Sequence, residues 1–468
     1  MTFSSSVFLF LFLPAFLLGY YLIRPSFRNG FVVFCSLVFY GWGEPRFLLV
    51  MICSVLMNYL LGLLADADRE AFWRKTAVTL CVVMNLGLLF VYKYLGFFVT
   101  TLNQVASKAW PVPQIALPIG ISFFTFQGMS YVIDVYRREV RAQKNPFRTM
   151  LYVVMFPQLI AGPIVRYKDI AAQIDHRSVN LDRMKAGIAR FMVGLAKKMM
   201  LANTMGAVVD EIFAVDPASL AVPTAWLGAI CYAMQIYYDF SGYSDMAIGL
   251  GKMIGFEFQE NFRQPYVADS IKDFWRRWHI SLSEWFRDYL YFPLGGSRRG
   301  NVYLHLAAVF LATGIWHGAT WNFVLWGVWH GAFRILEYAL EKKAGRRIRG
   351  VAGWIYTMLV VLIGWVLFRA DNLGYAWSYL RRMFGLLPAS FIPYSFGWYF
   401  TPKTGMVLLA ALLVAVVPGM KFYAPLRRSI EARSWTRGLR RMVVIVLFLY
   451  SLALVMTSTY NPFIYFRF

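Results

Sequence analysis

The sequence predicts an all-helical protein that crosses a membrane many times. Hydrophobic residues make up 59% of its 468 residues and charged residues only 15%, and the mean hydropathy is +0.52. Soluble globular proteins of this length carry more charge and fewer apolar residues, so the composition excludes that class.

Apolar runs near the length of a transmembrane helix, about 20 residues, recur along the whole chain. They predict about eleven spans, at 7–23, 30–43, 47–65, 77–99, 115–135, 149–165, 219–238, 303–333, 351–368, 404–420 and 442–458. The longest run, 303–333, fits either one tilted helix or a broken pair. The stretches 189–212 and 242–256 are amphipathic or interrupted, which favours interfacial or re-entrant segments. No polar linker separates these runs, so we expect a single transmembrane domain over 1–468.

The distribution of basic residues predicts the orientation in the membrane. No basic residue precedes the first apolar run, so that run is interpreted as a retained span rather than a cleavable signal. Arg24 and Arg28 follow it, which predicts that this end faces the cytoplasm and that the N-terminus is periplasmic.

The net charge of +23 has an explanation that needs no nucleic-acid partner. Lys and Arg stand in short loops between the apolar runs, where positive-inside topology and contact with anionic lipids account for them. A polyanionic substrate, such as a coenzyme A thioester that donates an acyl group, would be attracted to the same face. The four cysteines are scattered without CxxC spacing, so we expect neither a disulfide framework nor a metal site.

His317 is the first candidate catalytic residue. It stands in Thr313–Trp321, inside the run 303–333. An ionisable residue at membrane depth is costly and predicts a functional site, and histidine exchanges protons near neutral pH. The structural alternative is that Gly314 and Gly318 mark ordinary helix packing, with the histidine bonded to a neighbouring backbone.

The polar stretch 257–300 contains the second candidate, His279. Here we expect an amphipathic helix over 272–291, with an apolar stripe of Phe274, Trp278, Leu282, Trp285 and Tyr289. An interfacial helix explains the stripe and its arginines but explains His279 less well. Three basic residues of this stretch are candidates for binding the donor's phosphates, although lipid contacts would use the same residues: Arg276, Arg277 and Arg287.

Three further features favour structural roles. Asp239 and Asp245 are six residues apart and lie on different faces of a continuous helix; Gly242 indicates a helix break, and capping is the preferred role of the acids. His330 lies about 220° around an ideal helix from His317, so we expect it to serve packing or gating unless the helix breaks between them. The loop Gly295–Gly300 lacks the Walker pattern and indicates a tight turn.

Motifs spread from end to end resemble the membrane-bound O-acyltransferase family, and within it the bacterial branch that acetylates exported polymers. The resemblance rests on Met1–Ser5, Leu117–Phe123, Phe156–Pro163, Tyr238–Gly251, Phe274–Ser283 and Trp316–Gly318. It implies a multi-helix fold with a central tunnel, a catalytic histidine at His317 and a second functional histidine at His279. It also implies periplasmic partner proteins that complete transfer to the polymer.

The resulting hypothesis is an inner-membrane O-acetyltransferase. It uses acetyl-CoA or another acyl thioester as donor substrate, holds no bound cofactor, and modifies an exported polysaccharide, alginate in the first instance. His317 acts as general base; His279 orients a substrate or stabilises the oxyanion. Two alternatives stay open: an acyltransferase for cellulose, peptidoglycan or teichoic acid, and a transporter of polysaccharide or lipid without chemistry.

Overall fold

The computed structural model describes residues 1–345, 348–420, 422–431 and 433–464, and every regular element in these ranges is a helix. The chain divides into two compact units. The first comprises Met1–Phe191 with Ser244–Gln259, and the second comprises Met192–Tyr243 with Glu260–Phe468. All the candidate histidines and arginines belong to the second unit.

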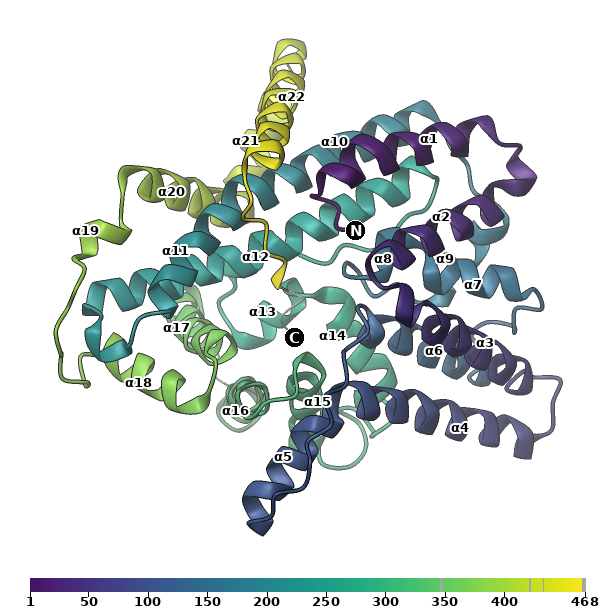
Figure 1. The fold of residues 1–468 in the computed structure, drawn as a ribbon, viewed down its shortest axis with the longest axis horizontal. Helices are drawn as coiled ribbons and strands as arrows, with labels where there is room; N and C mark the ends of the chain where they lie inside the picture. Colours follow the sequence, from purple (N-terminus) through teal and green to yellow (C-terminus); the bar gives the residue numbers. More distant parts are fainter. Residues whose placement is uncertain (346–347, 421, 432, 465–468) are drawn as a thin grey trace. The chain divides into compact units, whose positions relative to one another are not determined.

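The helices of the first unit range from four residues in α8 to 19 residues in α4. Its helices are α1 (Leu13–Leu22), α2 (Arg28–Gly43), α3 (Leu48–Leu64), α4 (Ala71–Leu89), α5 (Leu95–Ala106), α6 (Ile121–Tyr136), α7 (Pro146–Val154), α8 (Phe156–Leu159), α9 (Tyr167–Asp175) and most of α10 (Leu181–Ala196). Helices α3, α4 and α6 pack side by side (Figure 1). Asn85 of α4 donates to Asn58 of α3 at 2.9 Å, which satisfies two amides that lie inside the packed helices.

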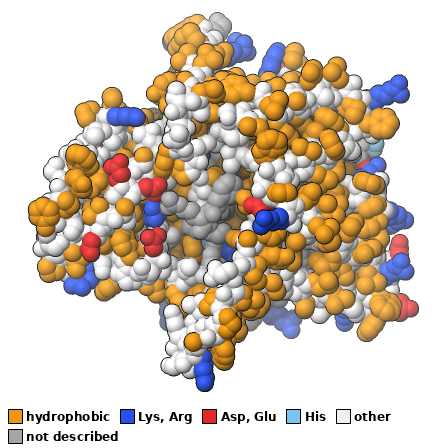
Figure 2. Space-filling view, viewed as in Figure 1, with side chains coloured by type: hydrophobic (Ala, Val, Ile, Leu, Met, Phe, Trp, Pro, Cys, Tyr) orange, Lys and Arg blue, Asp and Glu red, His pale blue; other side chains and the backbone are white. Residues whose placement is uncertain are grey.

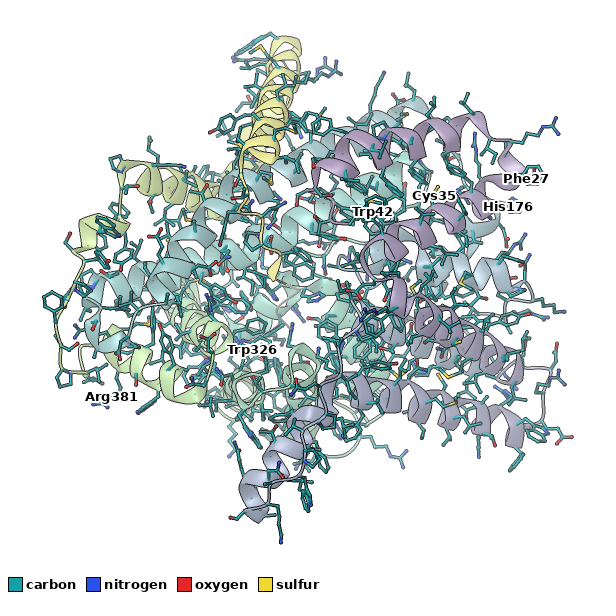
Figure 3. The ribbon with its side chains drawn as sticks, in the orientation of Figure 1. Phe27, Cys35, Trp42, His176, Trp326 and Arg381 are labelled. Atoms are coloured by element: carbon teal, nitrogen blue, oxygen red, sulfur yellow. The ribbon has the colours of Figure 1, made fainter. Side chains whose placement is uncertain are left out.

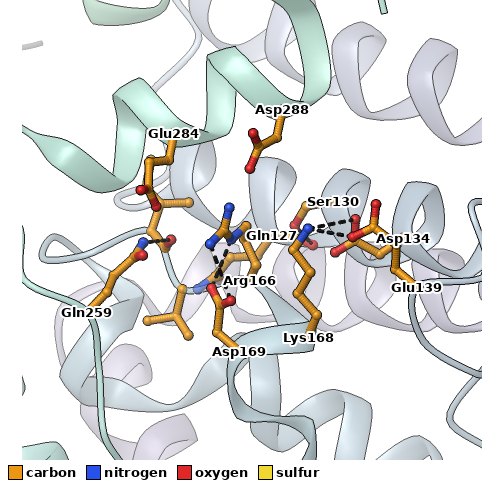
Figure 4. Close-up of polar contacts among 12 residues, drawn as sticks. Gln127, Ser130, Asp134, Glu139, Arg166, Lys168, Asp169, Gln259, Glu284 and Asp288 are labelled. Carbon is orange, nitrogen blue, oxygen red and sulfur yellow. Dashed lines mark hydrogen bonds and ion pairs between the residues drawn. The ribbon is translucent and has the colours of Figure 1, made fainter. Parts of the chain in front are cut away.

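Ion pairs attach α9 to α6 in this unit (Figure 4). The Lys168 ammonium lies 3.8 Å from the buried carboxylate of Asp134 and 2.6 Å from that of Glu139. Arg166 donates to Asp169 at 2.8 Å, one turn along α9. Because a buried carboxylate needs a partner, Lys168 accounts for Asp134 without a catalytic role.

The second unit has a core rich in aromatic residues. Its helices are α11 (Asn203–Phe213), most of α12 (Val222–Met253), α13 (Ile271–Arg277), α14 (Ile280–Phe286), α15 (Val302–His317), α16 (Trp321–Ala344), α17 (Gly350–Arg369), α18 (Leu373–Met383), α19 (Phe396–Tyr399), α20 (Pro402–Val416), α21 (Tyr423–Glu431) and α22 (Ser434–Thr457). Trp326, Trp365 and Tyr379 are among its largest fully buried side chains. Trp326 is labelled in Figure 3.

Five helices in the described ranges are long and apolar enough to cross a membrane: Pro45–Leu64, Ala71–Ala106, Gly350–Arg369, Pro402–Gly419 and Trp435–Thr457. All five were expected from the sequence, as were the shorter apolar helices Phe8–Leu22 and Val302–His317. Figure 2 shows hydrophobic side chains spread over the drawn face, with charged ones scattered between them. Exposed apolar surface on this scale suits contact with lipid. The expected count of about eleven spans is not confirmed.

Two of the expected segments are wrong. The run 149–165 contains α7 and α8, of nine and four residues, because Pro157 and the Gly162-Pro163 pair interrupt the helix. The stretch 242–256 is not a separate re-entrant segment, since α12 continues to Met253 without a break. Gly242 packs against a neighbouring backbone, and a Cβ there would lie 2.8 Å from the Gly194 carbonyl oxygen. Close helix packing, not a break, explains this glycine.

Candidate active site

His317 is the last residue of α15, at the point where the long apolar run breaks. Gly318 is extended, α16 begins at Trp321, and the two helices pack side by side. Of the two expectations for 303–333, the broken pair is confirmed. The glycines have a structural role: a Cβ on Gly314 would lie 2.4 Å from the Phe323 carbonyl oxygen. This close contact with α16 supports the structural alternative for these glycines, ordinary helix packing.

The His317 side chain is buried among aromatic rings. Its ring centroid lies 5.0 Å from those of Trp316 and Trp326 and 5.2 Å from that of Phe368. It also lines a cavity of about 10 Å³, which has room for about one water-sized group. The complete lining is Ile236, Phe240, Trp278, His317, Trp326, Trp365, Phe368 and Ile464.

His279 divides the segment that was expected to be one helix. Its backbone is left-handed, with φ 44° and ψ 54°, and it separates α13 from α14. A continuous 272–291 helix is thus wrong, although all five residues of the apolar stripe are buried as expected. A left-handed conformation is costly for a residue with a side chain and is retained mostly at functional positions. The carboxylate of Glu337 helps to fix α13 by accepting from the Ile271 and Lys272 amides.

Asn261 sets the orientation of His279. The Asn261 side-chain oxygen accepts from the Ser281 amide at 3.3 Å and from the Ser281 hydroxyl at 2.9 Å. The same oxygen lies 3.2 Å from His279 Nδ1, so Nδ1 must carry the proton of this contact. Burial lowers the pKa of His279 to about 3, which keeps the ring neutral at physiological pH. Nε2 is then an unprotonated acceptor, and it has no hydrogen-bond partner among the described residues.

The structure brings the two candidate histidines to the same aromatic residue. The Trp316 ring centroid lies 6.1 Å from that of His279 and 5.0 Å from that of His317. Phe240 contacts His279 at 4.6 Å between ring centroids and also lines the small cavity. One constellation therefore contains both residues predicted to be catalytic.

A second, larger cavity of about 550 Å³ lies in the same unit. Its lining includes Thr313, one turn before His317, and Ile280, next to His279. Four of its lining side chains are basic and two are acidic: Lys272, Arg276, Arg287 and Arg334, with Glu284 and Glu341. Pockets of this size are typical of small-molecule sites, and the excess of positive charge suits an anion.

Only two of the three candidate arginines line this cavity. Arg276 and Arg287 line it, whereas Arg277 does not. Arg277 instead donates to Asp273, one turn earlier on α13, at 2.8 Å. Arg287 also carries ion pairs, at 2.8 Å to Asp288 and 3.8 Å to Glu284.

His330 lies close to the site because the helix breaks after His317. Both histidines contact the Trp326 ring at 5.0 Å between centroids. His330 is fully buried, and neither ring nitrogen has a hydrogen-bond partner among the described residues. The ring centroid of Trp275 lies 5.3 Å from that of His330, and Trp275 lines the larger cavity. His330 therefore packs between aromatic residues next to both cavities.

The acids at the end of the motif Tyr237–Met246 are ion-paired and do not cap a helix. Within the second unit, the Asp239 carboxylate lies 2.6 Å from the ammonium of Lys198, and both side chains are almost fully buried. Within the first unit, Asp245 accepts from Arg190 at 2.8 Å. The capping interpretation was wrong because α12 continues past both residues, so no helix end is present there.

The Asp239–Lys198 pair also holds the C-terminal segment of the chain. Asp239 accepts from the Ile464 amide at 2.8 Å, and Lys198 bonds the Pro462 carbonyl. Ile464 lines the small cavity beside His317. These contacts join positions more than 200 residues apart, so no local pattern in the sequence indicated them.

Several residues of the site were not singled out from the sequence. Trp326 lies in a Trp-rich helix whose pattern is typical of packing, and Arg334 and Lys272 belong to ordinary charged faces. Asn261 gave the best available signal, as an amide in the same polar stretch as His279, although it is 18 residues away. The remaining members are Lys198 and Ile464.

Comparisons with known proteins agree with the predicted activity. The model of the MBOAT, membrane-bound O-acyltransferase family, matches residues 137–342, which include His279, His317 and His330. The protein named Probable alginate O-acetylase AlgI of Pseudomonas putida is 41% identical over 497 residues, covering 100% of both chains. The Azotobacter vinelandii protein of the same name is 40% identical with the same coverage. The Helicobacter pylori protein named Peptidoglycan O-acetyltransferase is 34% identical over 82% of this chain and 80% of its own.

The extent and level of these similarities identify the class of enzyme. The chain is a membrane O-acetyltransferase, and it belongs to the membrane-bound O-acyltransferase family.

Proposed function

We propose that this enzyme passes acetyl groups from a cytoplasmic thioester across the bacterial inner membrane, for O-acetylation of an exported polysaccharide, alginate. The names of the full-length relatives support the acceptor. The observation that carries the proposal is the joint packing of His279 and His317 on Trp316 beside a small buried cavity. Two buried imidazoles in one site suit proton transfer better than they suit a passage for a polymer.

His317 acts as the general base in this proposal. It accepts the proton of the acceptor hydroxyl while that oxygen forms a bond to the thioester carbonyl carbon. When the carbon–sulfur bond breaks, the departing sulfur takes up the proton. His317 ends α15, and the negative end of a helix dipole stabilises the imidazolium that forms. A positioned base of this kind contributes about 10²–10⁴-fold to the rate.

His279 orients the acceptor. With Nδ1–H donated to Asn261, Nε2 offers a lone pair to a substrate hydroxyl. The other role considered for this residue, donation to the oxyanion, would need a proton on Nε2. The hydrogen bonds of Asn261 thus favour orientation over oxyanion stabilisation.

The larger cavity receives the donor, acetyl-CoA or another acyl thioester, from the cytoplasmic side. Arg276 and Arg287 bind its phosphate groups there. Trp275 lines this cavity and contacts Trp326, which lines the small one, at 5.6 Å between ring centroids. A tunnel joining the two cavities requires movement of this pair of rings. Periplasmic partner proteins complete delivery of the acetyl group to the polymer.

Deleting the gene tests this function directly. We expect acetate to disappear from the exported polysaccharide and to return on complementation, as measured by proton NMR of the purified polymer. The peptidoglycan of the same cells is the control, because one relative is named for that acceptor. Loss of acetate from peptidoglycan alone would replace the proposed acceptor, and unchanged acetate in both would reject the proposal.

Neighbouring arginines provide a matched pair for the donor site. We expect Arg276→Gln to raise the KM for the donor thioester about tenfold, because it removes a charge from the larger cavity. Arg277→Gln breaks the partly exposed pair with Asp273 and a 3.3 Å bond to the Arg263 carbonyl, and it removes no charge from this cavity, so its KM should stay within about twofold. Initial rates of acetylation at varied donor concentration distinguish the two. Equal effects of both variants would contradict the donor assignment.

A further inference from the structure

Trp326 shares the small cavity with His317. The two ring centroids are 5.0 Å apart with an interplanar angle of 84°, and both residues line the cavity of about 10 Å³. Trp326 is fully buried in the core of the second unit, where Figure 3 labels it. It is therefore held next to the proposed base without exposure to solvent.

The indole N–H of Trp326 has no hydrogen-bond acceptor among the described residues. An indole nitrogen can only donate, and a buried tryptophan N–H usually finds a partner. Some tryptophans of this unit follow that rule and others do not: the indole N–H of Trp275 also has no acceptor among the described residues, but Trp275 lines the larger cavity and not the one that His317 lines. Trp329, on the same helix as Trp326, donates to the Val360 carbonyl at 2.9 Å, and Trp354 donates to the Tyr266 carbonyl at 2.9 Å. An unsatisfied donor beside a proposed active site calls for an acceptor supplied by the substrate.

The proposed reaction supplies such an acceptor. When the hydroxyl oxygen attacks, the carbonyl π electrons move to the carbonyl oxygen, and they return when the carbon–sulfur bond breaks. The transient negative charge needs a hydrogen-bond donor at the site. Nε2 of His279 carries no proton in the arrangement fixed by Asn261, so that residue does not provide one.

We propose that Trp326 donates its indole N–H to the acetyl carbonyl oxygen and stabilises the oxyanion of the transfer step. This inference rests on the proposed function, since it requires acyl transfer beside His317. It adds a catalytic residue of a type different from the two histidines.

The test removes the N–H while keeping the shape of the ring. Trp326 is replaced by β-(3-benzothienyl)alanine, which has sulfur in place of the indole N–H, by codon suppression in a strain lacking the chromosomal gene. Incorporation of ¹³C-acetate into the exported polysaccharide is followed by NMR at matched membrane levels of the protein. We expect the rate to fall about 10²–10³-fold, the effect of losing one oxyanion donor, with the temperature of unfolding in detergent unchanged.

The same replacement at Trp329 is the control. There it removes a satisfied hydrogen bond to Val360, so it should lower the unfolding temperature slightly and leave the acetylation rate within about threefold. If the Trp326 replacement is fully active while the separate variant His317→Ala is inactive in the same assay, this inference is overturned and the proposed function stays intact. Activity of His317→Ala would instead count against the base assignment. Equal losses at Trp326 and Trp329 would indicate a structural role.

Discussion

Replacing His317 with alanine is expected to abolish acetylation while the protein still folds and inserts. The imidazole is the proposed acceptor of the hydroxyl proton, and its loss should reduce the rate about 10²–10⁴-fold. The ring lines a cavity instead of spanning the core, so its removal should affect stability less than activity. Acetate in the exported polymer, measured by NMR, gives the activity, and immunoblots of membrane fractions give the protein level.

His176→Ala is the matched control for this variant. His176 is an exposed histidine at the end of α9, so its removal changes the histidine count without touching the site. We expect normal acetylation from it. Near-normal acetate in the His317→Ala strain would remove the base from the mechanism and favour the transporter alternative, which needs no chemical step.

Replacing Asp239 with alanine is expected to destabilise the protein most strongly. It leaves the buried ammonium of Lys198 without its carboxylate, 2.6 Å away in the intact protein, and breaking a buried pair in this way costs about 3–5 kcal/mol. It also frees the Ile464 amide and so loosens one wall of the His317 cavity. Thermal unfolding in detergent should show a lower midpoint, and acetylation should fall with it.

Two comparisons separate the buried charge from the loss of a side chain. The double variant Lys198→Met with Asp239→Leu removes both charges, and we expect it to recover much of the lost stability. Asp175→Ala breaks the pair between Arg148 and Asp175, whose side chains are about 40% exposed, and should cost no more than about 1 kcal/mol. A single Asp239 variant as stable as Asp175→Ala would show that the buried pair contributes little.

Candidate residues for the site could be named from the sequence, because ionisable side chains are rare in its apolar runs. A chain with five histidines and long apolar runs restricts proton transfer to few positions, and the structure brings His279 and His317 onto the same tryptophan. Composition likewise determined the helical membrane class, since lipid contact requires continuous apolar surface. Family motifs indicated the activity, and the comparisons confirmed it.

The geometry of the site was decided by tertiary structure. The break after His317 was one of the two expectations for its apolar run. Periodicity, which assumes a regular helix, failed at His279, where the backbone leaves that regularity. It failed in the opposite direction at Gly242, where close packing needs a glycine inside a continuous helix. Both errors have one cause: a glycine or a polar residue is compatible with a break and with tight packing, and only its neighbours decide between them.

The hydrogen-bond partners of the site residues could not be inferred from the local sequence. Asn261 orients His279 from 18 residues away, and Asp239 holds Ile464 from 225 residues away. The sequence by itself indicated which residues are candidates for the chemistry, because residue type sets proton affinity and hydrophobicity. Among the described residues, which nitrogen of His279 has no partner, which arginines line the cavity of about 550 Å³ and which indole N–H groups lack an acceptor depended on contacts that form only when distant segments pack together.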